Sequence, residues 1–213
     1  CTANLIPANG ILNAPDYTRT CSCAYQMQTS LGLIHMPELE YWTFGAQVPD
    51  EDLAINFGAP GDRRGPGGKM WLDFPEAGSP SVKVDVKIEP KSTEIFRHHS
   101  SRIKSGELKW VGASGLEGVE QVVIKLKSNG QYRVKLHFTE PEHVQSAQRI
   151  FDVSLQDKTV LSKLDIAQVA GGKHQVIARE FKVAVLDQTL KINLKAYDGT
   201  KPVLCGVQWV KIP

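Results

Sequence analysis

Polar residues that could take part in catalysis or binding occur in two short stretches of the sequence. In one of them, Glu140 and Glu142 flank Pro141, and His143 follows directly. Two carboxylates held about 5 to 10 Å apart across a sugar are what glycoside hydrolysis requires. Neighbouring loop carboxylates are usually solvated groups, however, and no second catalytic motif accompanies this pair. We therefore expect a protein that is not an enzyme.

The other stretch contains a pair of histidines, His98 and His99. Together with His143 they could form a zinc or copper site, because imidazole is a common ligand of both metals. Side chains of neighbouring residues in an extended segment point to opposite sides, so the pair cannot easily face one ion. Polar loop histidines are the simpler interpretation, and we expect neither a metal nor any other cofactor.

The stretch from residue 132 to residue 155 contains the elements that must position the first of these loops. Apolar and polar residues alternate in its first half, with the period of two that is typical of a half-buried β-strand. The apolar members are Tyr132, Val134, Leu136 and Phe138. Pro141 interrupts the strand, and the alternation resumes over residues 151–155. The same alternation places His137 on the polar face, where we expect it to be exposed or half-exposed.

Short runs of this kind recur along the chain, most of them bounded by Pro, Gly or Ser-Asn turn signals. The predicted strands cover residues 52–58, 69–74, 81–88, 93–97, 109–113, 118–126, 132–139, 151–155, 176–183, 188–196 and 202–212. Many short strands with few helices predict an all-β fold, an antiparallel β-sandwich of the jelly-roll kind.

Residues 1–47 differ from the rest of the chain, because turn residues follow one another there without sustained alternation. Within this region, residues 26–36 could form a short helix that Gly32 and Pro37 would limit. We expect an irregular extension over residues 1–47, followed by one β-sandwich domain over residues 48–213.

Three of the four cysteines, Cys1, Cys21 and Cys23, lie in this extension. A segment that cannot bury a core of its own is suited to disulfides in an oxidising compartment. We favour a link from Cys1 to either Cys21 or Cys23, because the single residue between the latter two fits no C-x-x-C motif. Cys205 lies in the apolar run P-V-L-C-G-V, where we expect a small buried hydrophobic residue.

The composition is that of an ordinary globular protein, with a formal net charge of +2. Lysines are spread over the alternating strands rather than gathered in one basic run, so we expect no nucleic-acid partner. No apolar run reaches the ~18 residues of a membrane helix, so we expect no membrane span. The sequence begins with Cys1 rather than Met, and we interpret it as a fragment; a lipidated Cys1 is the alternative.

Three segments of the sequence carry a resemblance to a known family. They read Y-R-V-K-L-H-F-T-E, then R-I-F-D-V-S-L-Q-D-K-T-V-L-S-K-L-D-I, then Y-D-G-T-K-P-V-L-C-G-V. Over residues 52–212 the chain resembles the malectin and malectin-like carbohydrate-binding domains. The resemblance implies a galactose-binding-like or malectin-like sandwich that binds a sugar through loops at one end.

The resemblance also implies particular binding residues. An acidic residue in a Tyr-Asp turn contacts the sugar in that family, and Tyr197-Asp198 matches the turn. An ordinary Asp-Gly turn is the alternative explanation of Tyr197-Asp198-Gly199. Asp198 is the single residue that we consider the best candidate.

The chain departs from the family where aromatic residues would stack on the sugar. Glu142 and His143 stand in place of an aromatic pair. His98, His99 or Ser101 stands near the place of another aromatic residue. Trp71 remains the best stacking candidate, although burial in the sandwich is the more common role of such a tryptophan. We expect binding to rely on hydroxyl hydrogen bonds more than on stacking.

The first residues of the chain resemble the closing part of bacterial PQQ-type β-propeller proteins in which a malectin-like domain follows. We therefore predict a non-catalytic carbohydrate-binding module, or lectin, of a secreted or periplasmic protein. The alternative is a structural module that docks onto an upstream β-propeller or a partner subunit. Apolar residues of the extension support that alternative: Ile6, Leu12, Tyr25 and Leu33.

Overall fold

The computed structural model describes residues 5–14, 31–36, 39–45, 53–76, 82–143, 145–197 and 199–213. The chain forms two compact units, Cys1–Leu39 and Glu40–Pro213. The predicted disulfide among Cys1, Cys21 and Cys23 and the predicted binding residue Asp198 lie outside the described residues. Each unit is described by itself below.

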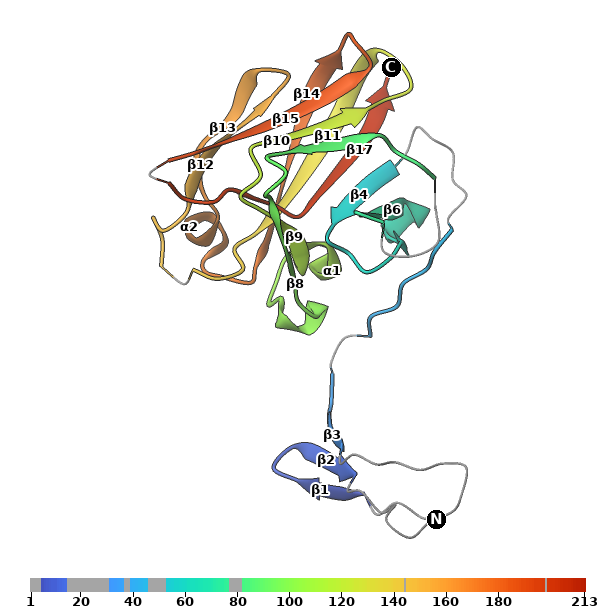
Figure 1. The fold of residues 1–213 in the computed structure, drawn as a ribbon, viewed down its shortest axis with the longest axis vertical. Coiled ribbons are helices and arrows are strands. Elements are labelled where there is room, and N and C mark those ends of the chain that lie inside the picture. Colours follow the sequence, from blue (N-terminus) through green and yellow to red (C-terminus); the bar gives the residue numbers. More distant parts are fainter. Residues whose placement is uncertain are drawn as a thin grey trace. The chain divides into compact units, whose positions relative to one another are not determined.

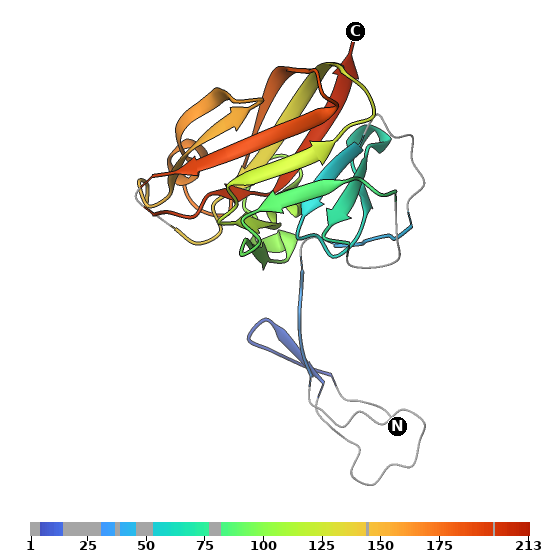
Figure 2. The ribbon, with the colours of Figure 1, turned by 45° about the horizontal axis from the view of Figure 1, so that its top comes forward.

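The larger unit is a sandwich of two sheets, as Figures 1 and 2 show. One sheet has the strand order β13-β12-β15-β10-β7, formed by Lys158–Asp165, Ile150–Leu155, Thr189–Ala196, Gln121–Lys125 and Val86–Glu89. The other has the order β14-β11-β17-β4-β6-β5, formed by Val176–Val185, Gly130–Thr139, Gly206–Ile212, Leu53–Phe57, Met70–Phe74 and Arg63–Arg64. Within these two sheets only β4 and β6 pair in parallel. The predicted all-β sandwich is confirmed.

A third, small sheet lies at one end of this sandwich together with helix α1 (Figure 1). The sheet has the order β16-β9-β8, formed by Val203–Leu204, Ser114–Glu117 and Glu94–Arg97. The helices are the 3₁₀ turns η2 (Pro66–Gly68) and η3 (Ser100–Arg102) and the α-helices α1 (Lys109–Gly112) and α2 (Ile166–Ala170). No helix in the described ranges is both long and apolar enough to cross a membrane.

The core between the two sheets comes from the alternating residues that the sequence predicts. Val134, Leu136 and Phe138 of β11 are buried, and the Phe138 ring lies 6.1 Å from that of Phe151 in β12 of the opposite sheet. Full burial of one such side chain contributes roughly 1.5–3 kcal/mol to folding. The same side chains therefore fix the register of β11, since a slip by one residue would turn them outward.

The expectation for His137 is wrong, because its side chain is 0% exposed. It projects from β11 to the side opposite Phe138, where a second, outer group of aromatic residues covers the sheet. The His137 ring meets that of Trp71 edge to face at 5.2 Å, and Trp71 meets Trp110 of α1 at 5.5 Å. We call Trp42, Trp71, Trp110 and His137 the outer aromatic cluster.

Helix α1 replaces a predicted strand at residues 109–113. The helix packs closely on the sheet, since a Cβ added to Gly112 would lie 2.4 Å from the Thr139 hydroxyl and from a Val176 methyl. Only glycine fits at that distance. Four residues are too few to show a helical period, so alternation alone misassigned the segment.

The smaller unit contains an antiparallel sheet of three strands, β1 (Ile6–Ala8), β2 (Ile11–Ala14) and β3 (Leu31–Ile34). Asn9 and Gly10, both with positive φ, form the turn from β1 to β2. The helix predicted over residues 26–36 is wrong for residues 31–34, which form β3; residues 26–30 lie outside the described residues.

Residues 40–45 belong to the larger unit, although the sequence places them in the extension. Thr43 exchanges two backbone hydrogen bonds with Asp62, both of 2.8 Å. The Trp42 ring meets that of Trp110 edge to face at 6.1 Å. The compact unit therefore starts at Glu40 rather than at residue 48.

Candidate functional site

The structure separates the described members of the predicted binding residues into four places. Trp71 is 1% exposed in the core, so its ring is closed to a ligand and the alternative explanation of a buried sandwich tryptophan holds. His98 and His99 line a pocket beside α1. Glu142 and His143 lie in the loop after β11, and Tyr197 lies in the turn after β15.

The loop after β11 is organised by Glu140, which is buried. Its Oε1 accepts the N–H groups of Glu142 and His143, each at 3.0 Å. Its Oε2 accepts from Nε of Arg149 at 2.8 Å. Since both oxygens are occupied by these structural bonds, Glu140 is not placed to act as one of a catalytic pair.

Arg149 is 3% exposed and joins three parts of the chain. Besides Glu140, its guanidinium donates to Glu117 at the end of β9, at 2.7 Å, and to the carbonyl of Lys201. We call Glu117, Glu140, Arg149 and the Lys201 carbonyl the Arg149 hub. The hub ties the loop after β11 to the segment that follows the Tyr197 turn.

Tyr197 begins a tight turn in which its carbonyl accepts the N–H of Thr200 at 3.1 Å. Its hydroxyl donates to Oδ2 of Asp152 at 2.8 Å, and this bond raises the pKa of the tyrosine. The Tyr197 side chain is thus held against β12. The backbone places Gly199 at φ 72°, which an Asp-Gly turn requires.

A polar groove of about 760 Å³ adjoins this turn. Its lining includes carboxylates, amides and amines but no aromatic ring: Ser92, Glu94, Glu117, Gly118, Glu120, Gln121, Asn193, Leu194, Lys195, Ala196, Thr200, Lys201 and Pro202. Several of these groups are paired with one another, as Lys201 is with Glu94 at 2.9 Å and Gln121 with Asn193 at 2.7 Å. The groove offers hydrogen bonds but no stacking surface.

A second cavity combines aromatic and polar walls in about 270 Å³. We call it the tryptophan pocket, and it is lined by Glu40, Trp42, Pro60, Arg97, His98, His99, Trp110, Ala113 and Ser114. Segments 40–42, 97–99 and 110–114 therefore meet there. Two of the predicted binding residues, His98 and His99, belong to it.

Hydrogen bonds fix the polar wall of the tryptophan pocket. Oε1 of Glu40 accepts the N–H of Ser100 at 2.5 Å, and its Oε2 lies 3.8 Å from Nε2 of His99. Nδ1 of His99 accepts the N–H of Ser101 at 3.1 Å and so caps η3. Nε of Arg97 donates to the carbonyl of Gly58 at 2.6 Å.

The aromatic wall is supported from behind by Arg63. Its guanidinium carbon lies 4.4 Å from the ring centre of Tyr41, 5.5 Å from that of Trp42 and 4.8 Å from that of Trp110. These are cation–π distances. Arg63 thereby holds Tyr41 and Trp42 against the sandwich.

Burial and positive neighbours lower the pKa values of two histidines near the pocket, His98 and His174. Burial lowers the pKa of His98, Arg102 lowers it further, and Glu142 raises it. Burial likewise lowers the pKa of His174, followed by the charges of Arg102 and Lys173. The pKa of Lys201 is raised chiefly by its hydrogen bond to Glu94 and by the charge of that residue, and the charge of Glu142 adds to this effect.

Three residues that line the pocket are not predicted from the sequence as site residues: Trp42, Trp110 and Glu40. Trp42 lies in Y-W-T-F, a dense aromatic run that could have been a signal, but it fell within the region interpreted as an extension. Nothing in the described ranges brings three metal-ligating side chains together. The arrangement is suited to holding a small ligand between indole rings and polar groups, rather than to acid–base chemistry.

Residues 119–206 match the family model of the Malectin domain. A probable LRR receptor-like serine/threonine-protein kinase of Arabidopsis thaliana is 37% identical over 73 residues, which are 32% of this chain and 7% of the kinase. The chain therefore spans only a small fraction of that relative's length.

Solved structures share the fold at low identity. The ANX2 ectodomain of Arabidopsis thaliana is similar with a TM-score of 0.60 and 16% identity, covering 76% of this chain and 49% of that one. A Bacteroides uniformis β-glucuronidase is similar with a TM-score of 0.61 and 15% identity, covering 76% of this chain and 18% of the enzyme. The family match and the fold together support a carbohydrate-binding or interaction module of the malectin-like kind.

Proposed function

We propose that the larger unit is a non-catalytic carbohydrate-binding module whose site is the tryptophan pocket. The observation that carries this proposal is the meeting of two indole rings with polar groups in one cavity of about 270 Å³. Sugars present C–H faces that stack on aromatic rings and hydroxyls that need fixed hydrogen-bond partners. The polar groove offers only the second of these.

The chemistry of the pocket distinguishes it from the site that the resemblance implies. Stacking would come from Trp42 and Trp110 rather than from the loop after β11, where Glu142 and His143 replace the family's aromatic pair. Hydroxyl groups would bond to Glu40, His98 or His99. The cavity volume suits one sugar ring, such as the end of a chain, more than an extended oligosaccharide.

The proposal also concerns the location of the protein and the absence of an enzymatic role. The similar ANX2 ectodomain supports an extracellular or secreted location. A periplasmic location, the other one expected from the sequence, stays a prediction. The similarity to a β-glucuronidase is no argument for an enzymatic role of this chain, because it covers only 18% of the enzyme and concerns the fold alone. The Malectin match supports a binding module instead.

A glycan array tests this proposal with the intact chain and three variants. Trp42→Ala removes a pocket wall that is partly exposed, and we expect it to abolish saturable binding. Asp198→Ala tests the turn that the family resemblance favours. Phe44→Ala removes a neighbouring exposed ring that does not line the pocket and serves as the matched control.

Loss of binding in Trp42→Ala but not in Phe44→Ala would support the tryptophan pocket. Loss in Asp198→Ala alone would move the site to the turn after β15. Folded protein that binds no glycan would refute carbohydrate binding altogether.

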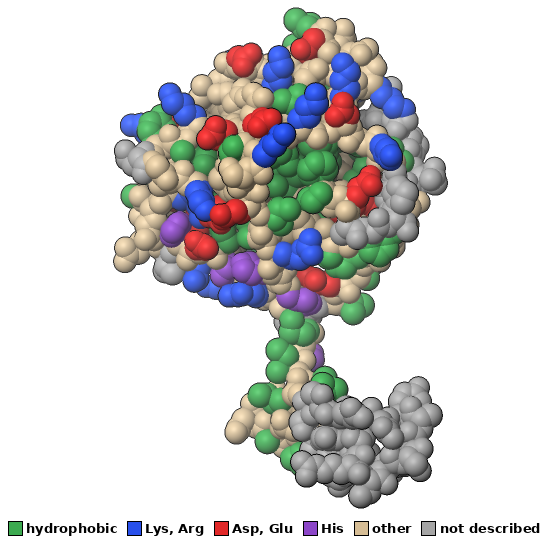
Figure 3. All heavy atoms as spheres, viewed as in Figure 1, with side chains coloured by type: hydrophobic (Ala, Val, Ile, Leu, Met, Phe, Trp, Pro, Cys, Tyr) green, Lys and Arg blue, Asp and Glu red, His purple; other side chains and the backbone are tan. Residues whose placement is uncertain are grey.

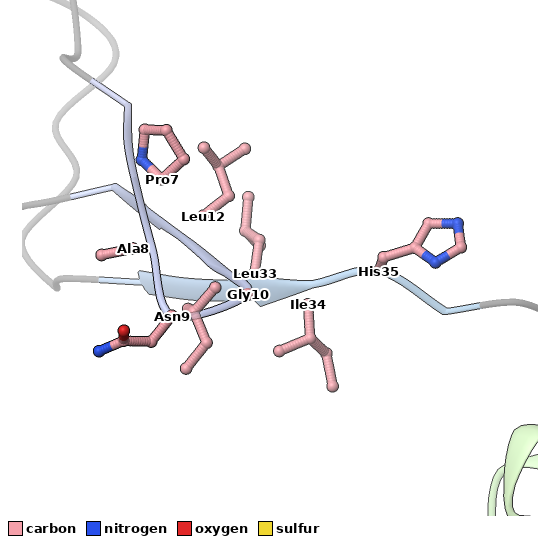
Figure 4. A pocket seen from close by; sticks show the side chains of 9 residues that line it. Pro7, Ala8, Asn9, Gly10, Leu12, Leu33, Ile34 and His35 are labelled. Atoms are coloured by element: carbon pink, nitrogen blue, oxygen red, sulfur yellow. The ribbon is translucent and has the colours of Figure 1, made fainter.

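A docking module is the second candidate function, and the smaller unit favours it. Its β-strands carry exposed apolar side chains: Leu33 is 48% exposed and Ile34 is 61% exposed. Figure 4 shows the apolar cavity of about 550 Å³ that these strands border, with Pro7, Leu12 and Leu33 at its wall. An upstream β-propeller of the PQQ type, or a partner subunit, would cover such a surface.

Removal of residues 1–39 separates the two functions. The cut leaves Glu40 and Trp42 in place, so a sugar-binding unit should keep its ligand. A module whose function is docking should lose its partner after the same cut. Removal of residues 1–47 would not discriminate, because it also deletes part of the tryptophan pocket.

A further inference from the structure

A cluster of basic residues lies beside the tryptophan pocket. We call it the basic cluster, and its members are His98, Arg102, Lys104, Lys173 and His174. The N–H of Lys104 donates to the carbonyl of His174 at 2.7 Å, which holds the two segments together. The rings of His98 and His174 meet edge to face at 5.7 Å. Figure 3 shows histidine and Lys or Arg side chains side by side near the lower margin of the larger unit.

The basic cluster has an excess of positive charge. Within the described ranges, no carboxylate forms an ion pair with Arg102, Lys104 or Lys173. Arg102 instead places Nη1 3.2 Å from Nδ1 of His98. Burial and the charge of Arg102 lower the pKa of His98, whereas the charge of the Glu142 carboxylate raises it. Among the charges that act on His98 and His174, three are fixed cations and one, that of Glu142, is negative.

A buried polar atom in the cluster also lacks a partner. His174 is 6% exposed, and its Nδ1 has no hydrogen-bond partner among the residues that the structure describes. Buried polar groups are nearly always hydrogen-bonded, and an unmade bond costs free energy unless water or a ligand completes it. The atom is therefore a second indication, independent of the charges, that this place receives a polar group.

We propose that the saccharide bound in the tryptophan pocket is acidic, and that its carboxylate or sulfate group lies over the basic cluster. This inference rests on the proposed carbohydrate-binding function. His98 connects the two places, because it lines the pocket and also contacts Arg102 and His174. A sugar ring on the tryptophans would therefore direct a charged substituent past His98 to the cations.

The chemistry of the cluster fits an oxyanion. Arginine binds carboxylate and sulfate groups through two parallel N–H donors, and lysine adds a compact charge. Burial, and after it the positive neighbours, hold the pKa values of both histidines below their usual range, so the fixed charge comes from Arg102, Lys104 and Lys173. Recognition would then not depend on a protonated imidazole.

Calorimetric titration of the intact chain with three size-matched oligosaccharides tests the proposal: one neutral, one with uronate groups and one sulfated. We expect at least one acidic ligand to bind about tenfold more tightly than the neutral one, with an advantage that falls as salt is raised. The variant Arg102→Gln/Lys104→Gln should remove that advantage. The variant Lys87→Gln/Arg133→Gln removes the same charge from exposed strand positions and should keep it.

The outcomes separate this proposal from the one on which it rests. Equal affinity for neutral and acidic ligands overturns the acidic specificity and leaves carbohydrate binding standing. An acidic preference that survives Arg102→Gln/Lys104→Gln overturns the role of the basic cluster. Absence of binding by any ligand overturns both. Comparison of the uronate with the sulfated ligand identifies the favoured anion.

Discussion

Two arginines of the larger unit are held in opposite ways. Arg149, in the hub, is surrounded by carboxylates and a carbonyl that accept its N–H groups. Arg63, behind the tryptophan pocket, is surrounded by the rings of Tyr41, Trp42 and Trp110. Its Nε and Nη1 are buried and find no hydrogen-bond partner in the part of the chain that the structure describes. One is fixed by directional bonds and the other by contact with aromatic faces.

The difference shows which region can adapt to a ligand. Hydrogen bonds between buried charges demand one geometry, because each broken bond leaves a charge without compensation. Aromatic contacts tolerate small shifts, because a ring attracts a cation over much of its face. The hub therefore keeps the loops in place, whereas the aromatic wall of the tryptophan pocket can shift slightly to fit a ligand.

Replacing Arg149 should break the hub and give the largest effect. In Arg149→Met, the buried Glu140 and the half-buried Glu117 would lose their partner, and we expect a loss of about 3–5 kcal/mol in the free energy of unfolding. Urea unfolding measures it. Adding Glu140→Gln and Glu117→Gln should restore part of the loss. Arg133→Met is the control, since its half-exposed pair with Glu180 contributes about 1 kcal/mol at most.

Acid should weaken the outer aromatic cluster through His137. Burial lowers the pKa of His137 from 6.5 to about 4. Between these values the unfolded chain binds a proton that the folded protein does not, so stability falls as the pH drops from 6.5 to 4. The expected loss from this residue is about 3 kcal/mol.

Urea unfolding at pH 7 and pH 4.5 checks the contribution of His137. His137→Leu should lose less stability over that interval than the unaltered chain, because the side chain no longer titrates. His35→Gln, at an exposed position of the smaller unit, should leave the pH dependence unchanged. Equal pH dependence in His137→Leu and in the unaltered chain would contradict the prediction.

Replacing Arg63 tests whether aromatic contact is the weaker form of support. Arg63→Met keeps much of the apolar contact and removes two buried nitrogens that have no partner. We expect a change of about 1 kcal/mol or less in the free energy of unfolding, together with weaker sugar binding as Trp42 loses its support. A loss as large as that of Arg149→Met would abolish the contrast between the two regions.

The smallest effect concerns the turn after β15. Tyr197→Phe removes the hydrogen bond to Asp152 but leaves the backbone bonds of the turn, so we expect no measurable change in unfolding. The N–H of Lys163 is the main cause that lowers the pKa of Asp152, and it remains. NMR titration should therefore show only a small rise in the Asp152 pKa. A full return of that pKa to its ordinary value would contradict the main role of the Lys163 N–H.

Alternation in the sequence predicted the sandwich well where one face of a strand is buried. It identified β11, β12, β15 and β17 because their inward residues recur at every second position. It failed for His137, since the last residues of β11 are buried on both faces. The cover on the second face comes from Trp71 and Trp110, which are distant in sequence.

The candidate site was less accessible to sequence reasoning. The tryptophan pocket forms where residues 40–42, 97–99 and 110–114 meet, and no spacing within one segment shows that meeting. His98 and His99 were identified through the family resemblance. Their function and that of Tyr197, Glu142, His143 and Asp198 stay predictions.

The place of β17 has a consequence for how the chain folds during synthesis. β17 is the final strand of the sequence, yet it lies in the interior of the six-stranded sheet between β11 and β4. β4 and β6 can join β11 only after residues 206–212 have left the ribosome. Until then the apolar side chains of both strands stay exposed. We therefore expect this sheet to close slowly and late, and the nascent chain to need protection from aggregation.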